Sequence, residues 1–128
     1  MSYYFSKALD TSFDDALDRV MEELKKEGFG ILTEIDVKQT LKNKLDVDFR
    51  NYRILGACNP PFAYKALQAE AKIGTMLPCN VIVQETAGGN VEVAAVDPVA
   101  SMQAIQNEEL RDIAGQVREK LKQVIDQL

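Results

Sequence analysis

The feature that most constrains the fold of this chain is a β-hairpin signal in its second half. Apolar residues occupy every second position of segment 77–83, and a second apolar run covers 91–96. The tripeptide Gly-Gly-Asn at 88–90 separates the two runs, and such residues form the tight turns between antiparallel strands. We therefore expect two neighbouring antiparallel strands whose apolar face is covered by another layer.

Two long segments have the apolar spacing of amphipathic helices. The first begins after Ser12, which forms a capping-box pattern with Asp15, and ends before Gly28. The second covers 108–128 and carries an apolar stripe wide enough to cover one face of a sheet. The residues of this stripe are Leu110, Ile113, Ala114, Val117, Leu121, Val124, Ile125 and Leu128.

Three further strands and two shorter helices precede the hairpin. We expect strands at 2–8, 29–35 and 52–57, and both faces of the middle one look partly buried, as in a central strand. The shorter helices are expected to begin after Asp36 and after Asn59, because Asp and Asn are favoured helix N-caps.

The predicted element order is β-α-β-α-β-α-β-β-α. A right-handed crossover through the helix after Asp36 would make strands 29–35 and 52–57 parallel. We therefore predict an α+β fold in which residues 1–128 form a single two-layer domain. Its sheet is expected to be mixed and five-stranded, with the helices mainly on one face.

Composition excludes several classes of function. The chain has no His, so Ser-His-Asp triads, Cys-His dyads and His-ligated metals are excluded within one chain. A net charge of −5 repels phosphate backbones, so no nucleic-acid partner is expected. The absence of a membrane-spanning run or a signal sequence predicts a cytoplasmic protein without a membrane partner. Its two cysteines are expected to be reduced.

Cys58 is the first candidate for chemistry. It stands where a predicted strand ends and a helix begins, directly before Asn59. The positive end of a helix favours a thiolate, although Pro60 and Pro61 remove two first-turn N–H donors. We expect modest activation, with Cys58 the more reactive of the two thiols. The alternative is a half-buried small residue in a tight turn.

Cys79 lies on the apolar side of its predicted strand, where a buried core cysteine is the ordinary interpretation. The hairpin register places residue 79 or 80 opposite Asp97, so the Cys79 thiol, the Asn80 amide and the Asp97 carboxylate would meet. The alternatives are an exposed strand residue at Asn80 and a helix cap at Asp97.

Asp36 completes the set of candidate ligand-binding residues. If strands 29–35 and 52–57 are parallel, Asp36 and Cys58 lie at the same end of the sheet. With Asn59 they would form a cradle for an anion or polar ligand at two helix N-termini. Asp36 and Asn59 are otherwise plain helix caps. A metal held by Cys58 and Cys79 is a weaker hypothesis, because their spacing matches no metal motif.

Five segments together resemble the family called domain of unknown function 302. The resemblance implies a compact α+β domain that is usually a homodimer, and it implies no established activity. The segments are Gly28-Phe29-Gly30, Glu34-Ile35-Asp36-Val37, Gly56-Ala57-Cys58-Asn59-Pro60-Pro61, Leu77-Pro78-Cys79-Asn80 and Asp97-Pro98.

Three functions are compatible with these residues. The first is a small dimeric binding module that holds a polar or anionic ligand, or a metal, near Cys58. The second is a cysteine-dependent enzyme or redox protein, which would have to use Cys58 without an imidazole base. The third is a structural or interaction protein whose cysteines are inert. The sequence leaves the identity of any cofactor or substrate open.

Overall fold

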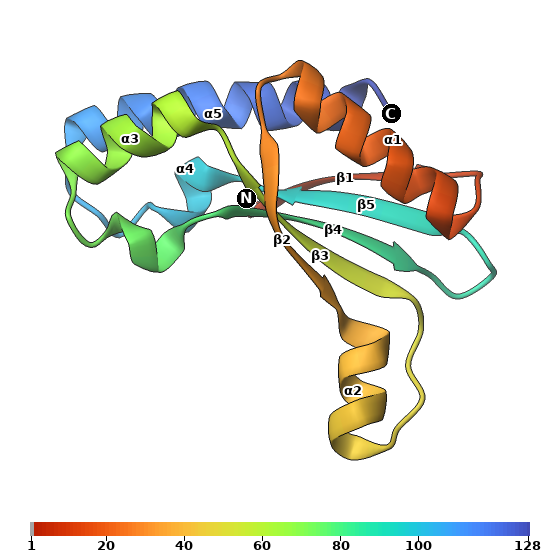
Figure 1. Cartoon of the computed structure of the whole chain (residues 1–128). Helices are drawn as coiled ribbons and strands as arrows, with labels where there is room; N and C mark the ends of the chain where they lie inside the picture. The colour runs from red at the N-terminus through yellow and green to blue at the C-terminus, as the bar shows by residue number, and fades with distance from the viewer. Residues whose placement is uncertain (1) are drawn as a thin grey trace.

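Five antiparallel strands form one sheet in the computed structural model, which describes residues 2–128 (Figure 1). Their spatial order is β1-β5-β4-β3-β2, and every neighbouring pair is antiparallel. The α+β class and the number of strands agree with the sequence-based prediction. The strands are β1 (Tyr4–Leu9), β2 (Gly30–Asp36), β3 (Tyr52–Cys58), β4 (Cys79–Glu85) and β5 (Val91–Val96).

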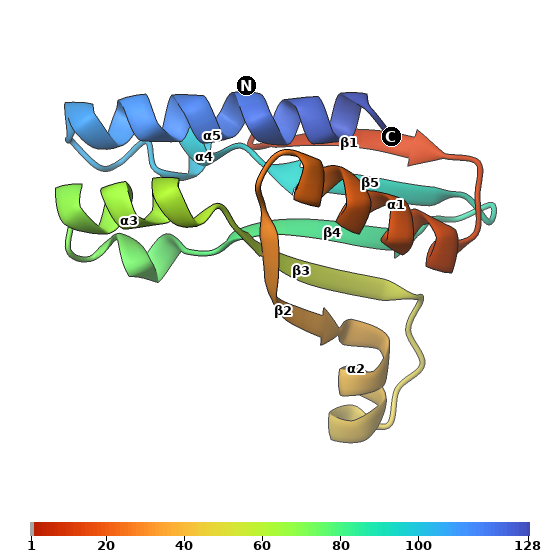
Figure 2. The ribbon, with the colours of Figure 1, turned by 45° about the horizontal axis from the view of Figure 1, so that its top comes forward.

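The helices form a second layer over one face of the sheet. Figures 1 and 2 show α1 and α5 over the strands, α3 beside α5, and α2 projecting on the other side. The two layers match the sequence-based expectation, with α2 as the exception. The helices are α1 (Phe13–Lys26), α2 (Val37–Leu45), α3 (Pro60–Ala69), α4 (Pro98–Ser101) and α5 (Glu108–Asp126), and a 3-10 turn, η1 (Ile73–Met76), follows α3.

Polar side chains begin the two long helices where the sequence predicts. Ser12 accepts a hydrogen bond from the backbone N–H of Asp15 at the start of α1. Asn107 accepts one from the N–H of Leu110 at the start of α5. Each bond satisfies a first-turn donor that has no partner inside the helix.

The core lies between the sheet and α1 and α5. Residues of β4 and β5 alternate between buried and more exposed positions, so Val81, Val83 and Val93 face the helices with no exposed surface. Leu24 of α1 and Leu121 of α5 are equally buried from the other side. Burying a side chain of this size contributes roughly 1.5–3 kcal/mol, and this layer therefore holds the sheet in place.

The prediction of a mixed sheet with parallel strands 29–35 and 52–57 is wrong. β2 and β3 are antiparallel, and Gly30 pairs with Cys58 while Asp36 pairs with Arg53. The reason lies in α2, which has no buried residue and projects from the end of the pair instead of crossing the sheet. β2 is also an edge strand, not a central one.

Within residues 2–128, every helix is too short or too polar to cross a membrane.

Candidate functional site

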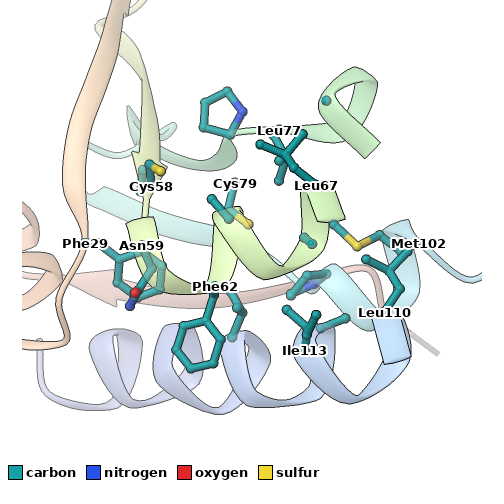
Figure 3. A pocket seen from close by; sticks show the side chains of 18 of the residues that line it. Phe29, Cys58, Asn59, Phe62, Leu67, Leu77, Cys79, Met102, Leu110 and Ile113 are labelled. Carbon is teal, nitrogen blue, oxygen red and sulfur yellow. The ribbon is translucent and has the colours of Figure 1, made fainter. Parts of the chain in front are cut away.

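A cavity of about 320 Å³ lies between α3, the first half of α5 and one end of the sheet (Figure 3). Phe62 and Leu67 of α3 form one wall, and Leu110 and Ile113 of α5 form the wall facing them. Cys58 and the residues that follow the 3-10 turn close the end nearest the sheet. The cavity is therefore bounded by segments from the middle and the end of the chain.

The lengths of the elements explain why a cavity forms here. The 19 residues of α5 extend about 28 Å at ~1.5 Å per residue. The 6 residues of β5 extend only about 20 Å at ~3.4 Å per residue. The start of α5 therefore overhangs the sheet, and α3 packs beside this overhang (Figure 2). The space beneath the two helices has no strand to fill it.

Cys58 is the last residue of β3, is half-buried and lines the cavity. Pro60 and Pro61 occupy the first two positions of α3, as the sequence predicts. The structure thus places this thiol at a strand-to-helix junction, beside a cavity that is partly open to solvent.

Cys79 is the first residue of β4 and lines the same cavity, but it is buried. Its Cα pairs with that of Ala57, the residue before Cys58. Burial, and to a lesser extent the neighbouring Cys58, raises the pKa of the Cys79 thiol to about 11. The expected core position of Cys79 is confirmed. Both cysteines are free thiols.

Asn59 is buried at the N-cap position of α3, but its side chain makes no capping hydrogen bond. Instead its amide Nδ2 donates to the backbone oxygen of Glu27 over 3.1 Å. A Cβ at Gly28 would stand 3.2 Å from this Nδ2, and Gly28 has a positive φ of 87°. Asn59 therefore ties the end of α1 to the start of α3, and this contact explains why residue 28 is glycine.

Asp97 does not join the two cysteines. Val81 pairs with Ala95, and this register places residue 79 opposite Asp97 as predicted. The Asp97 carboxylate, however, accepts from the first N–H groups of α4 and lies 3.1 Å from the Arg118 Nε. The predicted helix cap is confirmed, and the side chain is absent from the cavity wall.

Asn80 is exposed on the face of the sheet that the helices leave open. The cavity wall does not include it. The expected meeting of a thiol, an amide and a carboxylate at this strand end therefore does not occur, because alternate residues of a strand point to opposite faces.

Asp36 lies at the far end of the β2–β3 pair from Cys58. Six residue steps separate Asp36 from Gly30, the partner of Cys58, which amounts to about 20 Å at ~3.4 Å per residue. Asp36 caps α2 by accepting from the N–H of Gln39, and it lies 3.3 Å from the Arg53 guanidinium. The predicted anion cradle of Asp36 and Cys58 is wrong, because it required parallel strands.

The wall of the cavity is almost entirely apolar. Its titratable groups are the thiols of Cys58 and Cys79. Within residues 2–128, no three His, Cys, Asp or Glu side chains come together as a metal-binding group.

The sequence-based predictions did not include a cavity wall formed by Phe29, Met102 and the first half of α5. The one signal for it was the excess length of the last helix over the strands.

The comparisons with known proteins agree with this architecture. The crystal structure of an uncharacterized conserved DUF302 protein from Bacillus stearothermophilus superposes with a TM-score of 0.91 and 27% sequence identity. The match covers 98% of this chain and 98% of that chain. No curated protein matches the chain. The family model described as "Domain of unknown function DUF302" matches residues 5–128. The expected family is thereby confirmed, and the chain belongs to DUF302.

Proposed function

We propose that this protein is a small-molecule-binding module whose ligand occupies the cavity beside Cys58. The observation that carries the proposal is the cavity of about 320 Å³. Ligand pockets in proteins are clefts or cavities of roughly 300–1,000 Å³ lined mainly by apolar side chains, and this cavity has that size and that lining. A chain of 128 residues that keeps such a space beneath two helices has the form of a binding module.

The same lining disfavours the cysteine-dependent enzyme. A nucleophilic thiol needs a base or an environment that favours its thiolate. No Asp, Glu, Lys or Arg lines the cavity, and Asp36 is at the other end of its strand. Burial makes Cys79 a poor nucleophile, since it raises the pKa of that thiol to about 11. Binding without catalysis is the simpler function for this site.

A matched pair of variants tests the binding function. Ala63→Phe inserts a ring into the cavity from α3, whereas Gln68→Phe places the same ring on an exposed position of α3 outside the cavity wall. The fluorescent probe anilinonaphthalene sulfonate should bind the wild type and Gln68→Phe, and Ala63→Phe should lose this binding. Equal fluorescence from all three proteins, or none from any of them together with no binding of the straight-chain alcohols described below, would exclude the cavity as a ligand site.

We also propose that the module is a homodimer joined through the open face of its sheet. An apolar row crosses this face, in which Ala94, Ile82, Ile54 and Ile35 are successive partners on four strands. Ile35 is 47% exposed. The other three residues are partly exposed. Contiguous exposed apolar patches mark interaction surfaces, and a second copy presents the same row.

The projecting helix α2 supports the same proposal. None of its residues is buried, and Leu45 is 65% exposed. Helices of fewer than about 12 residues are marginal in water without packing, so a second subunit would supply contacts that α2 lacks.

The two free thiols support a reducing compartment such as the cytoplasm as the location of the protein.

A further inference from the structure

We propose that the ligand of the cavity is a linear aliphatic molecule with a single polar end, bound with its hydrocarbon tail innermost. The proposal rests on the proposed binding function and adds the chemical class and orientation of the ligand. It replaces the polar or anionic ligand that the sequence suggests.

The inner wall leaves no partner for a polar ligand atom. The overhanging part of α5 contributes Leu110, Ile113 and Val117, and Met102 precedes it. Burying a polar group without a hydrogen-bond partner costs roughly 1–3 kcal/mol in proteins. A ligand with a hydroxyl or carboxylate at this depth would therefore bind less tightly than a hydrocarbon of the same shape.

The few polar groups of the lining stand at the end nearest the sheet. Asn59 already donates its Nδ2 to the Glu27 carbonyl. Cys58 is half-buried and is therefore accessible from outside. Beside it, an irregular register between Ile31 and Thr33 interrupts the β2–β3 pairing, and Leu32 between them lines the cavity while 65% exposed. A β-bulge re-aims a side chain in this way. We place the polar end of the ligand at this rim of Leu32 and Cys58.

Size and flexibility favour a chain over a compact ring. The cavity of about 320 Å³ is roughly twice the ~150 Å³ engineered cavity that holds one benzene molecule. Figure 3 places Cys58 and Met102 on opposite sides of the space, with Leu67 and Phe62 between them on α3. Methionine adapts its shape to irregular apolar partners. A flexible chain can follow such a space from the rim to the inner wall.

A series of straight-chain alcohols tests the class of the ligand. Titration calorimetry of the full-length wild type with hexanol, octanol and decanol should give dissociation constants that tighten about fourfold per added methylene, the factor expected for a buried methylene. Ala63→Phe should abolish this binding, and Gln68→Phe should keep it. Decanediol, which has the same chain with a hydroxyl at each end, should bind about tenfold more weakly than decanol.

The outcomes separate this inference from the proposed function. If anilinonaphthalene sulfonate binds in a manner sensitive to Ala63→Phe but alcohol affinity does not rise with length, the cavity binds ligands and the aliphatic class is wrong. Decanediol that binds as tightly as decanol would overturn the tail-first orientation. If neither probe nor alcohols respond to Ala63→Phe, the binding function itself is wrong.

Discussion

Two thiols line one cavity, yet their surroundings give them different chemistry. Cys58 ends a strand and is half-buried, whereas Cys79 is a core residue with a raised pKa. Asp36, which was predicted to lie at the same end of the sheet as Cys58, lies at the other end of the β2–β3 pair, so its negative charge is far from this thiol. The structure therefore removes one factor that would slow the reactions of the Cys58 thiol. It also shows why the Cys79 thiol should react slowly, since that thiol is buried.

We expect Cys58 to be alkylated faster than Cys79 at neutral pH. The Cys58 thiol is accessible, and burial keeps the Cys79 thiol protonated and covered. Iodoacetamide labelling of the native protein across pH, read by peptide mass spectrometry, measures both rates. Faster labelling of Cys79 would reverse the assigned roles.

The raised pKa of Cys79 predicts a loss of stability in alkaline solution. Between pH 9.0 and about 11 the unfolded thiol ionises while the folded one stays protonated. The unfolded state then binds fewer protons, so the free energy of unfolding falls as pH rises through this window, by roughly 3 kcal/mol in total. Below about pH 9 the thiol is protonated in both states, and its full contribution to the free energy of unfolding is present.

Urea unfolding of the wild type and Cys79→Ala across this window provides the measurement. Cys79→Ala leaves a small cavity and starts from a lower stability, but its curve should fall less steeply with pH. Parallel curves would show that Cys79 does not contribute to the alkaline loss.

At the scale of elements, three chain segments approach one another at Gly56. It pairs with Thr33 of β2 and Asn80 of β4. A Cβ at this position would overlap Thr33 Oγ1 and would stand 2.7 Å from Cγ of Pro78. Threonine is stiff at χ1 and the proline ring is rigid, so neither neighbour can move away cheaply. Residue 56 must therefore be glycine, because Thr33 and Pro78 approach its backbone too closely for a side chain. This position is next to the strand end that carries Cys58.

Gly56→Ala should therefore lower the free energy of unfolding by about 1–3 kcal/mol, as overpacking does. Gly30→Ala is the matched control, because a Cβ there meets nothing within 4 Å, and surface changes of this kind stay within about 0.5 kcal/mol. Thermal and urea unfolding measure both. If Gly56→Ala is as stable as Gly30→Ala, the close approach is not a constraint.

Local sequence signals predicted the helices and strands, whereas the direction in which strands pair was harder to predict. Ser12 and Asn107 cap helices through neighbours three residues away, so the sequence alone is sufficient to place those helix starts. The direction of β2 against β3 depends on whether the helix between them packs on the sheet, as the predicted crossover required. Val37, Leu41 and Leu45 are apolar residues at helical spacing in this helix. None of these residues is buried, so the connection is an extended hairpin and not a crossover.

Only part of the candidate site could be predicted, because it too depends on how distant strands pair. Cys58 and Cys79 share a cavity because β3 and β4 pair in the register that aligns Ala57 with Cys79. The ligand-binding roles of Asp36 and Asp97 were predicted from sheet ends and register alone. Each carboxylate has the alternative role that was also predicted, a helix cap, and each pairs with an arginine. The apolar wall depends on how far α5 overhangs the sheet, which is a property of tertiary packing and not of any motif.

At the scale of the whole molecule, the sheet has one face covered by helices and one face open, with α2 projecting beside the open face (Figure 1). The covered face holds the core and the cavity, and the open face holds the apolar row that includes Ile54 and Ile82. The proposed binding and the proposed self-association would thus use opposite faces, so a change on one face need not disturb the other.

We expect the wild type to be a dimer at micromolar concentration and Ile54→Glu to be a monomer, because a charge would be placed at the centre of the shared row. Tyr64→Glu is the control, since Tyr64 is 66% exposed on α3, away from the open face and outside the cavity wall. Light scattering gives both masses, and circular dichroism checks that the variants are folded. A monomeric wild type, or a folded Ile54→Glu dimer, would contradict this interface.

The most direct test of the cavity as a ligand site is a crystal structure of the wild type grown with decanol. We expect continuous density for one chain between α3 and α5, with the hydroxyl end at the rim of Leu32 and Cys58 and the tail against Leu110 and Ile113. Side chains of α3 collapsed into the space, with no decanol density there, would contradict it.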